Sequence, residues 1–313
     1  MTRKNQIVGL GLTTLDVLIR LGDMPTWEHG ARIDAFSFDG GGPVGTAMCA
    51  AARLGANVGF IGTAGNDRVA DLKVELLAEY GVDISHLLRR DAPEDQVVIV
   101  YVDARTGERT FSGFGRPRQN LLKPEELDKG YILSADYLHL EGFHPEAALQ
   151  AAKWMREAGK TVVIDGSKTQ EPDVRPYYRE LAPYVDVLIC GEGFGRALSG
   201  GIEDLYEAGR RILEMGPRIV VQTEGADGSY TVTKDEQFHT PAFACDVVDT
   251  TGAGDVFHGA YIVGLLHGWD LRTVATFSTA VSALKCQRLG GRAPIPTFAE
   301  VVAYLREREI ELP

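Results

Sequence analysis

The chain contains the stretch Asp249-Thr-Thr-Gly-Ala-Gly-Asp255, directly before an apolar run at Val256–His267 that predicts a helix. Gly252 and Gly254 let the backbone turn tightly and bring bare N–H groups close to a ligand. The first amides of a helix have no partner within it, and the positive end of the helix dipole faces the same point. The stretch therefore predicts an anion hole suited to a phosphoryl group.

Asp255 closes this stretch and has two interpretations. Aspartate is a favoured residue at a helix start, where it caps free backbone amides. Alternatively, its carboxylate accepts a proton from an attacking hydroxyl during phosphoryl transfer. These residues alone leave both roles open.

Around this stretch, predicted strands and helices alternate along the chain. The predicted strands are Gln6–Leu12, Asn57–Ile61, Tyr137–Leu140, Thr161–Asp165, Asp186–Ile189 and Arg218–Gln222. The predicted helices are Pro43–Leu54, Val69–Glu79, Pro145–Ala158, Ile202–Glu214, Gly254–His267, Leu271–Lys285 and Phe298–Glu309. Such alternation is typical of βαβ units around a parallel sheet.

Some segments look like short strands without intervening helices. They are Asp16–Arg20, Ala31–Phe38, Gln96–Asp103 and Arg109–Phe114, with a second hairpin at Ser229–Thr233 and Glu236–His239. The first four predict a small antiparallel sheet, built from about 13–38 and 95–115, that serves as a lid or a dimer surface. Open sheet edges need a cover, which favours a homodimer through this sheet.

Composition excludes several classes of protein. The 313 residues carry a net charge of −12, which disfavours a nucleic-acid or anionic-membrane surface. No linker divides the chain, so we expect one domain over residues 1–313. The four cysteines form no CxxC pair and predict buried free thiols in a reducing cytoplasm. The N-terminus reads as a first strand rather than a signal peptide.

Two signatures together resemble a known family. The glycine stretch resembles the C-terminal signature of the ribokinase-like (PfkB-type) carbohydrate kinases. The N-terminal signature of that family is similar to Gly40-Gly-Gly-Pro-Val-Gly-Thr-Ala47 and Phe60-Ile-Gly-Thr-Ala-Gly-Asn-Asp67. The resemblance implies a three-layer α/β/α fold with a mainly parallel sheet and a small β lid. It also implies transfer of the ATP γ-phosphoryl group to an alcohol, with Asp255 as general base and the backbone of Gly252, Ala253 and Gly254 as anion hole.

The resemblance assigns further residues. The sugar would contact Asp16, Gly41, Gly42, Gly45 and Glu141. The nucleotide would contact Thr223, Gly225 and Gly228 at its phosphates, and Ala283 and Gly291 at its base. A simple strand–hairpin turn is the alternative for the first three, and core packing explains Ala283 equally well. Asp249 caps a turn or helps hold a monovalent cation such as K⁺, and both stay open. Mg²⁺ is expected to be held by phosphates and water rather than by a protein cage.

The sequence departs from the family pattern at two places. Gly45 stands where the family usually has a sugar-contacting Asn, and the usual Asn-x-x-Glu is absent near Gly191–Phe194, where Glu192 is a partial substitute. A branch with the same signature includes sulfofructose kinases. A sulfonate would need fixed cations, for which the candidates are Arg105, Arg109, Arg116 and Arg118. Glu141 instead favours an uncharged sugar, while Lys168 is a candidate phosphate contact.

We therefore predict an ATP-dependent sugar kinase. A nucleoside kinase of the same fold is one alternative, with Phe114, Trp27 or Phe143 against the base. A sugar-binding protein without catalytic activity is the other, favoured only by the absent Asn-x-x-Glu.

Overall fold

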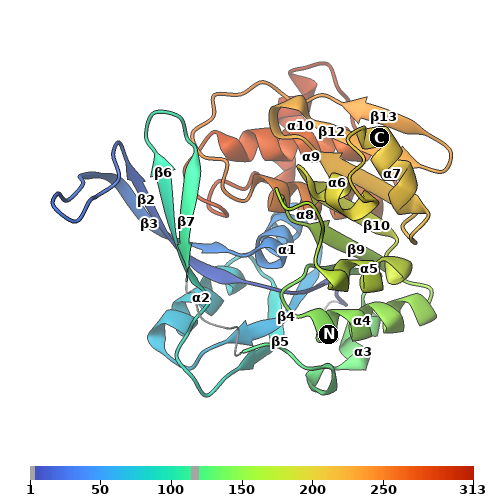
Figure 1. Cartoon of the computed structure of the whole chain (residues 1–313), viewed down its shortest axis with the longest axis horizontal. Coiled ribbons are helices and arrows are strands. Elements are labelled where there is room, and N and C mark those ends of the chain that lie inside the picture. The colour runs from blue at the N-terminus through green and yellow to red at the C-terminus, as the bar shows by residue number, and fades with distance from the viewer. Residues whose placement is uncertain (1–3, 114–119) are drawn as a thin grey trace.

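The computed structural model describes residues 4–113 and 120–313, and its centre is a nine-stranded sheet (Figure 1). The strand order is β13-β12-β11-β10-β9-β8-β1-β4-β5, and neighbouring strands pair in parallel except for β11–β12 and β12–β13 at one edge. The bounds are β1 Ile7–Leu10, β4 Val58–Ala64, β5 Asp83–Arg89, β8 Tyr137–Leu140, β9 Thr161–Gly166, β10 Val187–Gly191, β11 Ile219–Thr223, β12 Ser229–Thr233 and β13 Gln237–Thr240. The inner strands are apolar on both faces, as a sheet covered on both sides requires.

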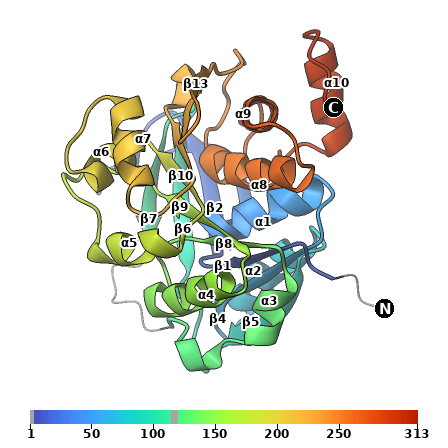
Figure 2. The ribbon, with the colours of Figure 1, turned by 90° about the vertical axis from the view of Figure 1, so that its right-hand side faces the viewer.

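Helices cover both faces and complete three layers (Figure 2). On one face lie α1 Pro43–Arg53, α2 Arg68–Ala78, α8 Ala253–Leu266, α9 Leu271–Cys286 and α10 Phe298–Arg306. On the other lie α3 Lys129–Ser134, α4 Pro145–Glu157, α5 Pro176–Leu181, α6 Phe194–Ser199 and α7 Leu205–Leu213. Short 3₁₀ turns occupy Pro124–Glu126, Ala182–Tyr184 and Gly225–Asp227. This is the predicted three-layer fold, although β5, α3, α5 and α6 were not predicted from the sequence.

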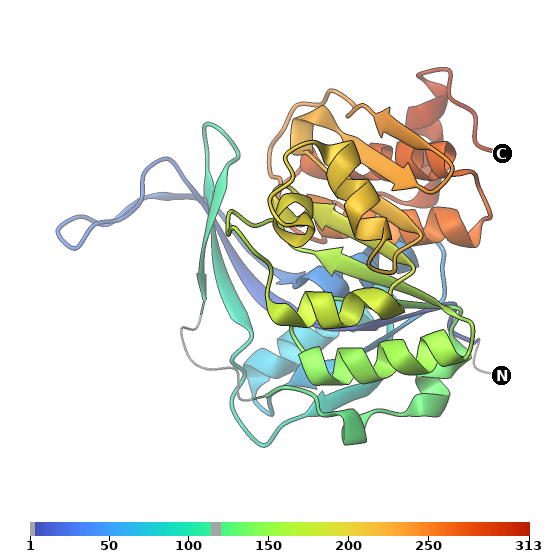
Figure 3. The same cartoon turned by 45° about the vertical axis from the view of Figure 1, so that its right-hand side comes forward.

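A second sheet of four strands stands to one side of the main body (Figure 3). We call it the small sheet. Its order is β3-β2-β6-β7, with bounds β2 Thr14–Leu21, β3 Ile33–Gly41, β6 Val97–Asp103 and β7 Arg109–Gly113. The prediction of a purely antiparallel sheet is wrong, because β2 and β6 pair in parallel. Each follows a strand of the parallel main sheet, β1 and β5, so both leave that sheet in the same direction.

The polar residues of interest lie where the parallel strands end. Leu10 of β1 pairs with Leu140 of β8, which in turn pairs with Ile164 of β9. Glu141 and Asp165 therefore reach the same edge of the sheet, from which the small sheet rises. Ligands of open α/β sheets bind at this carboxyl edge. Along the described residues, no helix combines the length and apolar character needed to cross a membrane.

Candidate active site

Helix α8 begins at the glycine stretch. Gly252 is its N-cap with a φ of 73°, in the left-handed region where a side chain would be strained. The Ala253 amide donates to the Thr250 carbonyl at 3.2 Å, which closes the turn before the helix. Asp255 follows in the first turn. Burial raises the pKa of Asp255, and the positive charges of Arg109, Arg292 and Lys285 oppose that rise.

Asp16 lies on β2 at the base of the small sheet and is 6% exposed. The Thr14 hydroxyl donates to its Oδ1 at 2.5 Å. Burial raises the pKa of Asp16 to about 6, which the Thr14 bond and the Arg292 charge partly counteract. A side chain at Gly41 would collide with the Asp16 carboxylate, and one at Gly42, whose φ is 84°, would meet the Leu12 carbonyl at 2.6 Å. The structure thus brings Asp16, Gly41 and Gly42 together.

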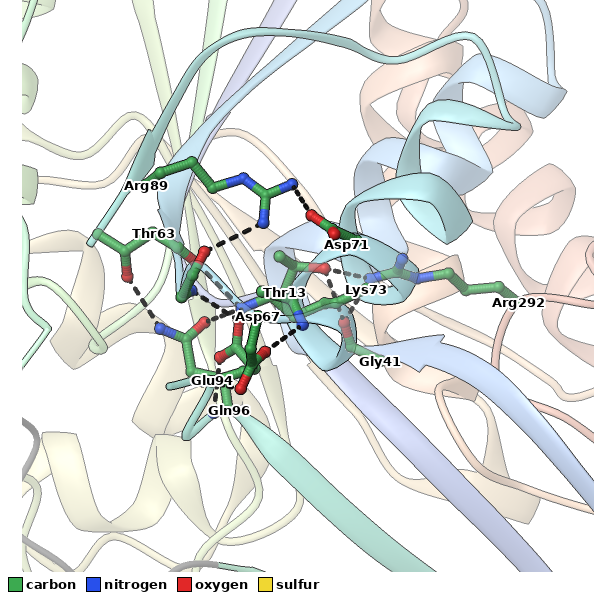
Figure 4. Close-up of polar contacts among 12 residues, drawn as sticks. Thr13, Gly41, Thr63, Asp67, Asp71, Lys73, Arg89, Glu94, Gln96 and Arg292 are labelled. Atoms are coloured by element: carbon green, nitrogen blue, oxygen red, sulfur yellow. Dashed lines mark hydrogen bonds and ion pairs between the residues drawn. The ribbon is translucent and has the colours of Figure 1, made fainter. Parts of the chain in front are cut away.

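Arg292 fills the space left by the missing side chain at Gly45. A Cβ at Gly45 would lie 2.5 Å from Arg292 Nη2 and 2.8 Å from Thr13 Oγ1. The guanidinium is fully buried and donates to Thr13 Oγ1 at 2.8 Å and to the Gly41 carbonyl (Figure 4). Its own backbone amide donates to Asp39 Oδ2 at 2.9 Å. A buried cation therefore occupies the space beside Gly45, and this position of Arg292 was not predicted from the sequence.

Two further acids meet at the edge of the main sheet. Glu141 is 5% exposed and accepts a hydrogen bond from the Leu12 amide at 2.8 Å. Asp165, which the sequence analysis did not single out, is 4% exposed. Burial and the charges of Asp255 and Glu141 raise the pKa of Asp165 well above its ordinary value. His258 is buried in α8, and its Nδ1 lies 3.5 Å from Asp165 Oδ2.

The residues expected at the nucleotide are spread over three segments. Thr223 ends β11, and its hydroxyl donates to the Cys190 carbonyl at 3.2 Å. Gly225 opens the following turn with a φ of 56°, and a Cβ there would meet open space. A Cβ at Gly228 would collide with the Thr240 carbonyl, so the β12–β13 hairpin by itself accounts for that glycine. Ala283 is buried in α9, and Gly291 packs against the Gly40 carbonyl.

Two cations predicted to contact anions have acidic partners. Lys168 pairs with Glu192 at the exposed carboxyl edge of the main sheet. Arg105 pairs with Asp103 at 3.0 Å in the turn between β6 and β7, where 71% of its side chain is exposed. Arg116, Arg118 and Phe114 lie outside the described residues.

Arg109 behaves differently from its neighbours on the small sheet. Its Nη1 donates to the Thr250 hydroxyl, within the glycine stretch. The turn before it packs on the same segment, because a Cβ at Gly107 would lie 2.9 Å from the Val248 carbonyl. The β6–β7 hairpin therefore rests on the segment that leads into Asp255, and it brings a positive charge there.

Asp249 is fully buried and its oxygens are all engaged. Its Oδ1 accepts from the Thr251 amide at 2.8 Å and the Thr251 hydroxyl at 2.6 Å, and its Oδ2 accepts from the Gly290 amide at 2.9 Å. Its backbone carbonyl accepts from Lys285 Nζ at 2.9 Å. This role of Lys285 was not predicted from the sequence, because the expectation for that helix concerned only Ala283 beside the nucleotide base.

A buried ion pair anchors the start of β6 (Figure 4). Lys73 Nζ lies 2.6 Å from Glu94 Oε2, and both side chains are almost fully enclosed. The ammonium also donates to the Thr63 carbonyl at 3.1 Å and to Gln96 Oε1 at 3.0 Å. The backbone carbonyl of Gln96 in turn accepts a hydrogen bond from the Leu15 amide at 3.0 Å, and Leu15 directly precedes Asp16. The pair thereby connects α2 to the strand that carries Asp16.

The site combines an acid at an anion-binding helix start with a group of buried acids that can accept hydroxyls. Such a site defines a phosphotransferase with an alcohol acceptor. The model of the pfkB family carbohydrate kinases matches residues 4–298, so the chain belongs to the PfkB family. It is therefore an ATP-dependent kinase of small sugars or nucleosides.

Individual relatives cover almost the whole chain. An ATP-dependent ribose-1-phosphate kinase of Halopiger xanaduensis is 31% identical, over 97% of this chain and 99% of its own. A nucleoside kinase of Methanothermobacter thermautotrophicus is 25% identical, over 96% of both. The crystal structure of a ribokinase from Thermotoga maritima superposes with a TM-score of 0.82 at 28% identity, over 96% of this chain and 99% of that one. The fold and the family expected from the sequence are confirmed; membership of the sulfofructose kinase branch stays a prediction.

Proposed function

We propose that the chain phosphorylates a hydroxyl of a small sugar at the expense of ATP, with Asp255 as the general base. The observation that carries this proposal is the position of Asp255, in the first turn of α8 and electrostatically coupled to Asp16 and Asp165. The pKa of Asp255 is raised, and a carboxylate with a raised pKa is a better proton acceptor at neutral pH than one with the ordinary value. Asp255 takes the proton of the acceptor hydroxyl.

The other residues have complementary roles. The amides of Gly252 and Gly254 donate to the phosphoryl oxygens, while the Ala253 amide holds the turn. Asp16 and Glu141 accept sugar hydroxyls. The missing side chains of Gly41 and Gly45 leave room for the Asp16 carboxylate and for Arg292, and Gly42 lies beside them. ATP supplies the phosphoryl group and Mg²⁺ neutralises its developing charge. The residues that would line the nucleotide are Thr223, Gly225, Gly228, Ala283 and Gly291.

The small sheet acts as a lid in this proposal, because its β6–β7 hairpin touches the glycine stretch. A closed lid excludes water and so limits hydrolysis of ATP. The face of β3 that carries Phe36 and Phe38 exposes both aromatic side chains by about half. We propose that a second copy covers this face, since exposed apolar patches are typical of interfaces.

An anionic sugar is a second candidate for the acceptor. Arg109 favours it, since a guanidinium beside Thr250 suits a phosphate or sulfonate on the acceptor. A nucleoside is less well supported. Of the aromatic residues expected against a base, Trp27 is fully exposed in the β2–β3 connection.

The test is ADP release with Mg·ATP across pentoses, hexoses, phosphorylated and sulfonated sugars, keto-deoxy acids and nucleosides. Asp255→Asn should lower kcat at least about 100-fold with little change in ATP affinity, because it removes the proton acceptor. Asp246→Asn is the matched control, as an exposed acid in the segment before the glycine stretch. An Asp255→Asn variant that retains most of the wild-type rate would contradict the assignment.

A further inference from the structure

Lys285 places a charge-bearing amine in the protein interior, behind the glycine stretch. It lies on α9, is fully buried, and its Nζ donates to the Asp249 carbonyl at 2.9 Å. An ammonium in the interior is costly unless oxygen atoms replace its water. Burial lowers the pKa of Lys285, and the Asp249 carboxylate opposes that shift. The segment around Asp249 thus supplies what a cation needs.

The same oxygens are those that a dissociable cation would use. Both carboxylate oxygens of Asp249 already accept bonds, from Thr251 and from the Gly290 amide. The Cys286 carbonyl accepts the amides of Val248 and Asp249 at 2.8 and 3.2 Å. A metal ion on the Asp249 carbonyl would stand directly beside the ammonium, and two like charges in a buried site repel strongly. The donor set around Asp249 therefore does not fit a K⁺ ion while Lys285 is present.

The position of Lys285 gives it a consequence for the active site. The Asp249 carbonyl that it holds lies three residues before Gly252, the N-cap of α8. Its charge is also among those that act on Asp255. An amine anchored in the core thus fixes the turn that presents the α8 amides, and it adds positive potential behind them.

We propose that Lys285 is a built-in cation of the glycine stretch, which takes the place of a dissociable monovalent cation and makes the protein independent of K⁺. Lys285 is a positioning residue, since it acts through the Asp249–Gly252 backbone. The effect on catalysis rests on the proposed kinase function. The effect of cations on stability does not.

The test compares cation responses of Lys285→Ala and Lys285→Met with those of wild type. Thermal unfolding and ADP release are measured in tetramethylammonium chloride, with NaCl, KCl or NH₄Cl substituted at constant ionic strength. Lys160→Met is the matched control, because Lys160 Nζ also donates to a backbone carbonyl, that of Ala135 just before β8. For wild type and for Lys160→Met, the unfolding temperature and the rate of ADP release should be the same in every salt.

Lys285→Ala leaves empty the volume that the ammonium group occupies in wild type. K⁺ and NH₄⁺ should therefore raise the unfolding temperature of this variant, while Na⁺ should not. Without these ions, kcat/KM should fall about 10- to 100-fold, as for loss of a group that orients a site from behind. K⁺ should recover at least tenfold of that loss. The proposal is overturned if K⁺ stimulates or stabilises wild type, or if both folded Lys285 variants ignore every cation. If wild type phosphorylates no acceptor, the kinase proposal fails, and the unfolding data still decide the role of Lys285.

Discussion

Replacing Lys73 by methionine should destabilise the whole protein, because it leaves the Glu94 carboxylate buried without a counter-charge. The two side chains are 0% and 1% exposed, so water cannot solvate the remaining charge. Breaking such a pair costs about 3–5 kcal/mol. Unfolding entropy is about 2.1 cal/mol/K per residue, or about 0.66 kcal/mol/K for 313 residues. A loss of about 4 kcal/mol therefore lowers the unfolding temperature by about 6 °C.

The assay is thermal unfolding of wild type, Lys73→Met, Glu94→Gln and the double variant at one salt concentration. The double variant should recover at least half of the loss, since it removes both charges. Arg89→Met is the matched control, because Arg89 pairs with Asp71 at 3.0 Å in the same region, with 39% and 69% of the side chains exposed (Figure 4). Exposed pairs contribute about 1 kcal/mol or less, so this control should lose at most about 2 °C.

The pair also predicts a kinetic effect. Gln96 links it to Leu15, beside Asp16, so Lys73→Met should raise KM for the sugar more than KM for ATP. An unfolding temperature within about 1 °C of wild type, or a double variant no more stable than the single one, would refute the reasoning.

Other changes separate the roles proposed for the active site and the small sheet. Since the pKa of Asp16 is raised to about 6, its carboxylate forms as pH rises through 6; KM for the sugar should fall over that range, and Asp16→Asn should remove this dependence. A flat wild-type profile would argue against hydroxyl binding by Asp16. Arg109→Ala should lower kcat/KM about 100-fold for a phosphorylated sugar, while Arg105→Ala, on the same hairpin but paired with Asp103, should change it less than about threefold. An equal loss for neutral and phosphorylated acceptors would instead assign Arg109 to the transferring phosphoryl group. Phe36→Ser combined with Phe38→Ser should halve the mass measured by light scattering, and a wild type that is already monomeric would end the dimer proposal.

Local patterns predicted most of the fold because they are short-range. The strand Tyr137–Leu140 has the predicted bounds. Gly252 lies in a tight turn directly before α8, as the glycine stretch predicts. The strand β5 was missed because its sequence, Asp-Ile-Ser-His-Leu-Leu-Arg, lies at the sheet edge and is only partly buried. The helix predicted at Ile202–Glu214 begins later, at Leu205, because Asp204 caps it.

The active site was predicted only where a motif keeps its residues close in sequence. Asp255 and the glycines belong to such motifs, whereas Arg292 meets Thr13 from 279 positions away. The periodicity of a sequence does not indicate contacts between residues so far apart in the chain. An arginine or lysine in a sequence reads by default as a solvated surface residue, and this default failed for the cations that shape the site.

These buried cations share one arrangement. Lys73 donates to the carbonyl of Thr63, Lys285 to that of Asp249 and Arg292 to that of Gly41. Each carbonyl belongs to a segment next to the proposed site. Each cation also interacts with an acid that offsets the cost of its burial: Glu94 for Lys73, Asp249 for Lys285 and Asp16 for Arg292. A protein with a net charge of −12 gathers several acids around one small molecule, and their mutual repulsion would spread the segments that carry them. Cations fixed in the core oppose that repulsion. This explains how Asp16, Glu141, Asp165 and Asp255 can lie together while the glycine segments keep their shape.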